Sequence, residues 1–180
     1  MIKNIVILGI FLLCCAMYSQ EENTISHLNE RHGLSFLISH SYISQGKIDG
    51  TREWLAAPSF GINYNFKLNE KWSIGLHNDI IIESFVVEDT SKDEDLLERE
   101  YPISNLIVGT YKITESWGIA VGGGIEWERN ENFGVIRIGT DYGLELNEKG
   151  LEVVFAINYD ALIDAYDSIN FGLGINKIFK

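Results

Sequence analysis

The stretch WGIAVGGGIEWE at residues 117–128 alternates bulky and small side chains over most of its length. One parity carries Trp117, Ile119, Val121, Ile125 and Trp127, and the other carries only glycine, alanine and glutamate. Side chains that alternate with a period of two lie on opposite faces of a β-strand, whereas a helical period would scatter them around an axis. The stretch therefore predicts a strand with one large apolar face and one small or polar face.

The same pattern recurs along the chain and gives eight strand-forming runs. The other seven cover residues 33–43, 58–68, 72–82, 101–113, 136–146, 151–160 and 169–180. Neither parity is cleanly apolar between Tyr101 and Ile113, so the sequence leaves the register of that strand open. The runs exceed the roughly five or six residues of an average soluble strand and match the roughly 9–11 residues of a transmembrane strand.

Lipid cannot satisfy backbone amides, so a membrane-spanning sheet must close on itself. We therefore expect an all-β chain that forms an eight-stranded antiparallel up-and-down transmembrane β-barrel. A soluble, lipocalin-like binding barrel is the alternative, because it also alternates but turns its apolar face inward. The glycine, serine and asparagine of the polar faces favour a narrow interior over a solvated exterior.

Short polar breaks separate three pairs of runs: LNEK at residues 68–71, ITES at 113–116 and LNEKG at 146–150. Outer-membrane barrels have tight turns at the periplasmic end and longer loops at the other end. Trp72 and Trp117 directly follow two of the breaks, which places them in the aromatic girdle of the periplasmic interface. The girdle at the other interface is predicted from Trp54, Tyr101, Trp127, Phe133 and Tyr159.

The first 19 residues have the layout of a secretory signal peptide, with Lys3, an apolar run and then small residues. Cleavage is expected after Ala16 or after Ser19. Residues 20–31 would then be an N-terminal periplasmic segment, and residues 32–180 the barrel. Both cysteines, Cys14 and Cys15, lie in the signal peptide, so the mature chain would have no thiol. An uncleaved anchor and a lipid on Cys15 are the alternatives.

From Gly33 to Lys180 the chain resembles the small eight-stranded outer-membrane barrels of the OmpA/OmpX type. The resemblance rests on the GGGIEWE strand, on the repeated turn followed by tryptophan, and on Phe179 close to the C-terminus. It implies the outer membrane of a Gram-negative-type bacterium, contact with lipid and lipopolysaccharide, and insertion by the barrel-assembly machinery. Lys177 and Lys180 depart from the usual final strand. We expect a monomer, and the net charge of −12 argues against a nucleic-acid partner.

The interior of an eight-stranded barrel is just wide enough to be filled by side chains. We expect a salt-bridge network there, centred on Arg137 and including Glu126 on the preceding strand and Asp141. The alternative is that these groups are simply hydrated near the two mouths. The full set of charged or titratable side chains predicted to face the interior is His77, Asp79, Glu83, Glu126, Arg137, Asp141, Glu145, Glu152 and Asp160.

Two sequence patterns resemble parts of a catalytic site or a metal site. His40 lies between Ser39 and Ser41, but neighbours in a strand point to opposite faces, so His40 is badly placed to activate either serine. Five residues in the acidic stretch 88–100 fit a calcium-loop template: Asp89, Ser91, Asp93, Asp95 and Glu100. Glu94 replaces the glycine that the template requires, and the flanking helices are missing.

We therefore expect no enzyme activity, no cofactor and no specific metal. The predicted role is structural or surface-interacting at the cell envelope. The alternative is a narrow transport or lipid-handling barrel, with a lipid A-modifying enzyme as a less favoured variant.

Overall fold

The computed structural model describes residues 31–48, 51–88, 96–147 and 150–179. The predicted signal peptide, its cleavage site and the segment up to residue 30 lie outside the described residues. None of the described residues belongs to a helix that is long and apolar enough to cross a membrane.

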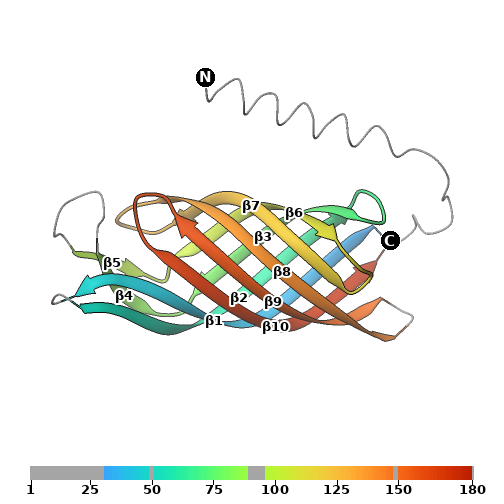
Figure 1. The fold of residues 1–180 in the computed structure, drawn as a ribbon, viewed down its shortest axis with the longest axis horizontal. Helices are drawn as coiled ribbons and strands as arrows, with labels where there is room; N and C mark the ends of the chain where they lie inside the picture. The colour runs from blue at the N-terminus through green and yellow to red at the C-terminus, as the bar shows by residue number, and fades with distance from the viewer. Residues whose placement is uncertain (1–30, 49–50, 89–95, 148–149, 180) are drawn as a thin grey trace, which may run out of the picture.

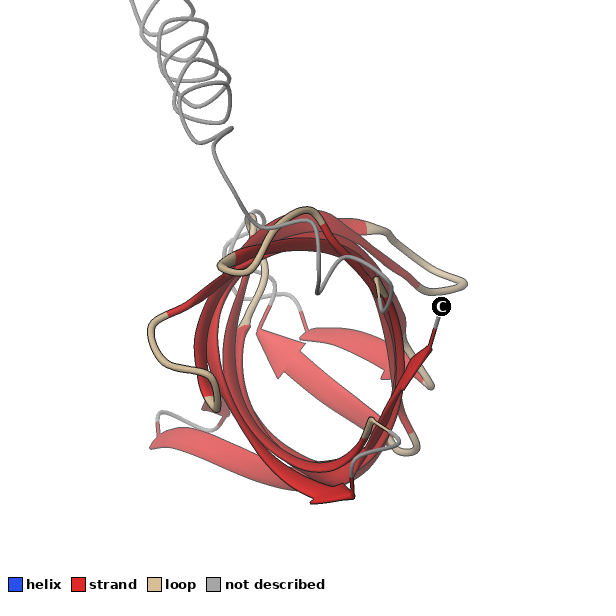
Figure 2. Cartoon of the chain, turned by 90° about the vertical axis from the view of Figure 1, so that its right-hand side faces the viewer, coloured by secondary structure: helices blue, strands red, loops and turns tan. Residues whose placement is uncertain are grey.

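Eight antiparallel strands form one closed barrel, in the order β1-β10-β9-β8-β7-β6-β3-β2. Figure 2 looks along the barrel and shows the closed ring of strands. The barrel strands are β1 (His32–Ile48), β2 (Thr51–Lys67), β3 (Trp72–Ile81), β6 (Ile103–Lys112), β7 (Trp117–Trp127), β8 (Phe133–Asn147), β9 (Leu151–Leu162) and β10 (Asp167–Phe179). Each predicted run contributes one strand, so the predicted eight-stranded up-and-down barrel is confirmed.

The large apolar side chains of the barrel point outward. Along β7, exposed side chains alternate with buried ones at the two ends of the strand, and Val121 is 56% exposed while Ala120 is buried. The same holds for Phe36, Phe155 and Leu173, which are all exposed on other strands. An apolar exterior around a polar interior is the arrangement of a transmembrane barrel and the reverse of a soluble one.

The register that the sequence left open belongs to β6. Ser104, Leu106, Val108 and Thr110 point inward and are buried, whereas Ile103 and Ile107 point outward. Two apolar side chains therefore lie inside, while Asn105 and Gly109 interrupt the outer face. This mixture explains why neither parity of the strand is cleanly apolar.

Two of the predicted tight turns close in the same way. The Leu68 and Ile113 amides donate to the carbonyls of Trp72 and Trp117, at 2.9 and 2.8 Å. In the first turn the side chain of Asn69 also accepts from the Trp72 amide. The third turn includes residues 148–149, which are not described. These turns share one end of the barrel, here called the turn end, with the start of β1 and the end of β10 (Figure 1).

The opposite end carries a second, two-stranded sheet, β4 (Ser84–Glu88) paired with β5 (Leu96–Glu100). We call it the β4–β5 hairpin. It lies beside the extended ends of β1 and β2 at the left of Figure 1, and across the far mouth in Figure 2. Residues 88–100 are expected from sequence to be an acidic loop, and the hairpin corrects that expectation for residues 96–100. Of the five calcium-template residues, Glu100 lies at the end of β5 and the other four are outside the described residues.

Candidate functional site: the filled barrel interior

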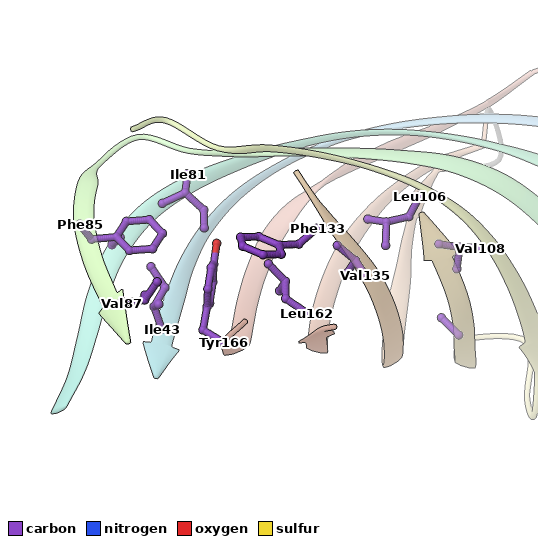
Figure 3. Close-up of a cluster of buried hydrophobic side chains, with 12 residues drawn as sticks. Ile43, Ile81, Phe85, Val87, Leu106, Val108, Phe133, Val135, Leu162 and Tyr166 are labelled. Carbon is purple, nitrogen blue, oxygen red and sulfur yellow. The ribbon is translucent and has the colours of Figure 1, made fainter. Parts of the chain in front are cut away.

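An apolar layer fills the barrel beneath the β4–β5 hairpin (Figure 3). Phe85 and Val87 of β4 are buried against Ile43 of β1 and against Tyr166 in the β9–β10 connection. The Phe85 and Tyr166 rings meet edge to face, with 5.6 Å between their centroids. The remaining members of this layer are Ala57, Ile81, Leu106, Val108, Ala120, Phe133, Val135 and Leu162. Together they form a buried apolar layer that runs from the β4–β5 hairpin, here called the lid, to Val108 inside the barrel (Figure 3).

A buried arginine joins the hairpin to the barrel wall. Arg99 of β5 is fully buried, and its Nη2 lies 2.6 Å from Oε1 of Glu126 on β7. Its Nη1 lies 3.3 Å from Oε2 of Glu128 and also donates to the carbonyl of Glu131. The guanidinium stands 4.9 Å from the centroid of the Phe133 ring, a cation–π contact. These contacts hold β5 against the end of β7 and the start of β8.

Tyr166 completes this cluster from the β9–β10 connection. Its hydroxyl donates to Oε1 of Glu126 at 2.7 Å. Burial, reinforced by the neighbouring Glu126 carboxylate, raises the pKa of the Tyr166 hydroxyl well above its usual value. The hydroxyl therefore stays protonated and remains a donor to Glu126.

A second buried arginine spans the interior further along the barrel. Nε and Nη2 of Arg137 donate to the two carboxylate oxygens of Asp160, each at 2.6 Å. Nη1 of Arg137 lies 2.7 Å from Oδ2 of Asp79. Asp160 is on the neighbouring strand β9, but Asp79 is on β3, and two strands separate β3 from β8 around the wall. The ion pair between Arg137 and Asp79 therefore crosses the lumen.

The structure separates the three residues that the sequence groups into one network. Glu126 is paired in register with Phe133, four positions from Arg137, and it binds Arg99 instead. Asp141 is opposite Gly118 and Ala156, nearer the turn end. Arg137 itself takes its partners from the wider predicted set, Asp79 and Asp160.

Three other predictions for single residues are wrong. Phe133 is predicted for the outer aromatic girdle, but it is buried and faces the interior over Arg99. Glu83 is predicted inside, but it is exposed in the connection between β3 and β4. Glu145 is predicted inside, but it is exposed near the turn end. This agrees with the alternative that such groups are hydrated near the mouths of the barrel.

Small polar side chains also line the interior on β1, β2, β9 and β10. The Ser41 hydroxyl donates to that of Ser59 at 2.9 Å, and Nδ2 of Asn170 donates to both serines. Closer to the turn end, Asn176 accepts from the Ser35 hydroxyl and donates to Glu152. The interior is therefore lined by hydrogen-bonded groups from β1, β2, β9 and β10.

The residues considered for catalysis lie apart from one another. Ser39 and Ser41 are buried inside the barrel, whereas His40 is exposed on its outer surface. His77 is inside, where its Nε2 lies 3.1 Å from Oδ1 of Asn65. Within the described ranges, no group of three or more His, Cys, Asp or Glu side chains could hold a metal ion.

The predicted girdle tryptophans lie on the outer surface at both ends of the barrel. Trp72 packs against Tyr111, with 4.9 Å between the ring centroids. Trp117 is half-exposed and its Nε1 donates to the Thr140 hydroxyl. Trp127 lies at the hairpin end of β7 and is also half-exposed.

Solved outer-membrane barrels share this architecture. Ail, the attachment invasion locus protein of Yersinia pestis, superposes with a TM-score of 0.56 at 12% identity, over 83% of this chain and 99% of that chain. Ail in complex with the heparin analogue sucrose octasulfate gives 0.50 at 16% identity, over 84% and 99%. Neisserial surface protein A gives 0.52 at 10% identity, over 82% and 97%. The chain has the fold of the small outer-membrane β-barrels.

At these identities the likeness concerns the fold alone. No protein-family model matches the chain, and no curated protein sequence matches it.

Proposed function

We propose that the protein is an outer-membrane barrel with a closed interior, which serves a structural or surface-interacting role at the cell envelope and is not a transport pore. The observation that carries this proposal is the filled lumen. The β4–β5 hairpin covers one end, apolar side chains fill the interior next to it, and the Arg137–Asp79 ion pair crosses the interior. The apolar exterior and the fold shared with Ail support the membrane location.

In this proposal the turn end faces the periplasm and the hairpin end faces outward. Trp72 and Trp117 then lie at the periplasmic interface and Trp127 at the outer one, where amphipathic indole rings are favoured. The lipid partners are those of the outer membrane, including lipopolysaccharide, and insertion depends on the barrel-assembly machinery. The chain carries a net charge of −12, which disfavours a polyanion such as the sulfated sugar bound by Ail.

Single-channel recording in planar bilayers tests the closed interior. We expect no discrete conductance steps from the wild-type protein, because side chains occupy the lumen from the hairpin to the serines. Membrane fractionation and gel mobility with and without boiling serve as controls, since a folded barrel enters the membrane fraction and migrates differently before heating. Reproducible conductance steps from a preparation that passes both controls would contradict the proposal and favour the narrow transport barrel.

A further inference from the structure

A pair of asparagines interrupts the apolar exterior on the face formed by β3, β6 and β7. Asn78 and Asn105 are register partners, and both are half-exposed on the outward parity of their strands. Nδ2 of Asn105 donates to Oδ1 of Asn78 at 2.8 Å. Nδ2 of Asn78 donates to the Ile62 carbonyl at 3.0 Å. The two amides are thus held in one orientation on the outer wall.

The pair lies near the middle of the membrane-crossing segment. Asn78 is six positions from Trp72, and Asn105 is six positions from Tyr111 and four from Tyr101. Six residues of a strand tilted by about 40° rise about 15 Å, which is roughly half of a hydrocarbon layer of about 30 Å. Polar side chains at this depth are costly and rare, and they usually mark a functional contact.

The amides keep unused hydrogen-bonding capacity. An asparagine side chain has two N–H donors and one carbonyl acceptor. Within the described residues, the Asn105 carbonyl oxygen and one N–H of each amide have no protein partner. Lipid tails offer none, so hydrogen bonds to another protein surface are favoured. Because the free groups include donors and an acceptor, the pair is complementary to a second copy of itself.

The surface around the amides allows close approach. Ile107 follows Asn105 on the outward face of β6 and is 63% exposed. Gly109 is the next residue on that face, and Gly123 is the register partner of Ile107 on β7. A Cβ added at Gly109 would contact only the Val121 carbonyl oxygen, at 3.8 Å. The glycines leave hollows beside a protruding side chain, which allow the wall of a neighbouring barrel to approach.

Other polar residues of the outer face have local explanations. The Thr140 hydroxyl donates to the Gly118 carbonyl. Lys177 lies close to the turn end, where a long side chain can reach the headgroups. His40 is exposed on β1, away from this face, and lines a surface hollow together with Tyr42 and Trp54. Among these residues of the described outer wall, the two asparagines alone bond to each other across neighbouring strands.

We propose that this face is the contact between two copies of the chain in the membrane, with Asn78 and Asn105 bonded to the same pair in the second copy. The inference rests on the proposed membrane location. Two copies inserted in the same direction are related by a two-fold axis along the membrane normal, so residues meet residues of equal depth. The amides of one copy then face the amides of the other. This proposal differs from the monomer expected from sequence.

Energy transfer between donor- and acceptor-labelled mature chains, reconstituted in phosphatidylcholine vesicles at several protein-to-lipid ratios, tests the proposal. For the wild type we expect energy transfer above the level of random proximity. For the double variant Asn78→Leu, Asn105→Leu, which loses the amide hydrogen bonds, we expect the dimer dissociation constant to rise about tenfold. Thr140→Val, which removes an outward hydroxyl elsewhere, is the matched control and should dimerise like the wild type. Random-proximity transfer for the wild type, or equal dimerisation of the double variant, would overturn the proposal.

Cysteine cross-linking provides a second measurement in case the double variant does not fold. Oxidation should link copies of Ile107→Cys, at the centre of the proposed contact, and should not link Ile138→Cys on β8. Equal linking of both variants, or of neither, contradicts the contact. A barrel that fractionates with membranes and shifts on boiling but stays monomeric overturns this inference alone and leaves the proposed function standing.

Discussion

At the scale of single residues, two buried arginines organise the interior. Arg137 is bidentate on Asp160 and also contacts Asp79, and Arg99 binds Glu126 and Glu128. Each guanidinium is almost fully buried and faces two carboxylates. Removing one charge of such a cluster leaves the others buried without compensation, which costs far more than the intact pair contributes.

Replacement of Arg137 should therefore destabilise the barrel strongly. In Arg137→Met the Asp79 and Asp160 carboxylates lose their cation, and we expect the free energy of unfolding to fall by about 3–5 kcal/mol. Urea unfolding in vesicles, followed by tryptophan fluorescence, measures the change.

Arg129→Met is the matched control, because Arg129 is exposed beyond the hairpin end of β7. It should change the unfolding free energy by less than about 0.5 kcal/mol. Equal stability of the Arg137 and Arg129 variants would show that the lumen ion pairs do not hold the strands together.

At the scale of elements, the β4–β5 hairpin is the part of the fold that sits on the barrel without belonging to it. It forms its own sheet. It is connected to the wall by the Arg99 contacts, by the buried Phe85 and Val87, and by hydrogen bonds from the Gln45 and Asn130 side chains to the Val86 and Glu98 carbonyls. The hairpin can thus loosen while the barrel stays closed.

Arg99→Met should release the hairpin selectively. Loss of about 3 kcal/mol from a broken buried pair corresponds to about a hundredfold faster amide exchange. We expect this acceleration in residues 84–88 and 96–100, with unchanged protection in β7 and β9. Hydrogen exchange read by mass spectrometry measures it. Glu98→Ala, an exposed side chain on the same strand, is the control, and an equal response of both variants or of the whole barrel would argue against a separately anchored lid.

Strand alternation was readable from sequence because each barrel strand separates lipid from lumen, and this requires one apolar parity. The pattern weakened where both faces carry mixed side chains, as with Leu106 and Val108 inside β6. The hairpin could not be predicted, because β4 and β5 are short. In addition, an arginine in an acidic stretch, as Arg99 is, is normally expected to be exposed to solvent. The rule that large apolar side chains face lipid gives the wrong answer for Phe133, because the interior contains an apolar layer at that position.

The sequence predicted several of the charged residues that face the lumen, but it did not predict which of them form ion pairs. The sequence indicated which parity of β3, β8 and β9 faces inward, and so placed Asp79, Arg137 and Asp160 inside. Which of them meet depends on where strands that are distant along the wall face each other across the barrel. That geometry is set by strand tilt and stagger, which single-strand patterns do not contain.

At the scale of the whole molecule, the barrel has an inverted arrangement, with apolar side chains outside and polar or tightly packed side chains inside. The closed interior, the girdles and the asparagine contact all follow from it. A soluble barrel with the same strands would turn each side chain to the opposite side of the wall.

Site-directed spin labelling along β7 tests this arrangement most directly. Single cysteines at positions 119, 120, 121, 123, 125 and 126 are introduced into residues 20–180, which contain no cysteine of their own. The labelled chains are reconstituted in vesicles, and collision with oxygen, which concentrates in lipid, is measured. We predict high oxygen accessibility at positions 119, 121, 123 and 125 and low accessibility at positions 120 and 126, whose native side chains are buried. Uniform accessibility, or maxima at the even positions, would contradict the account.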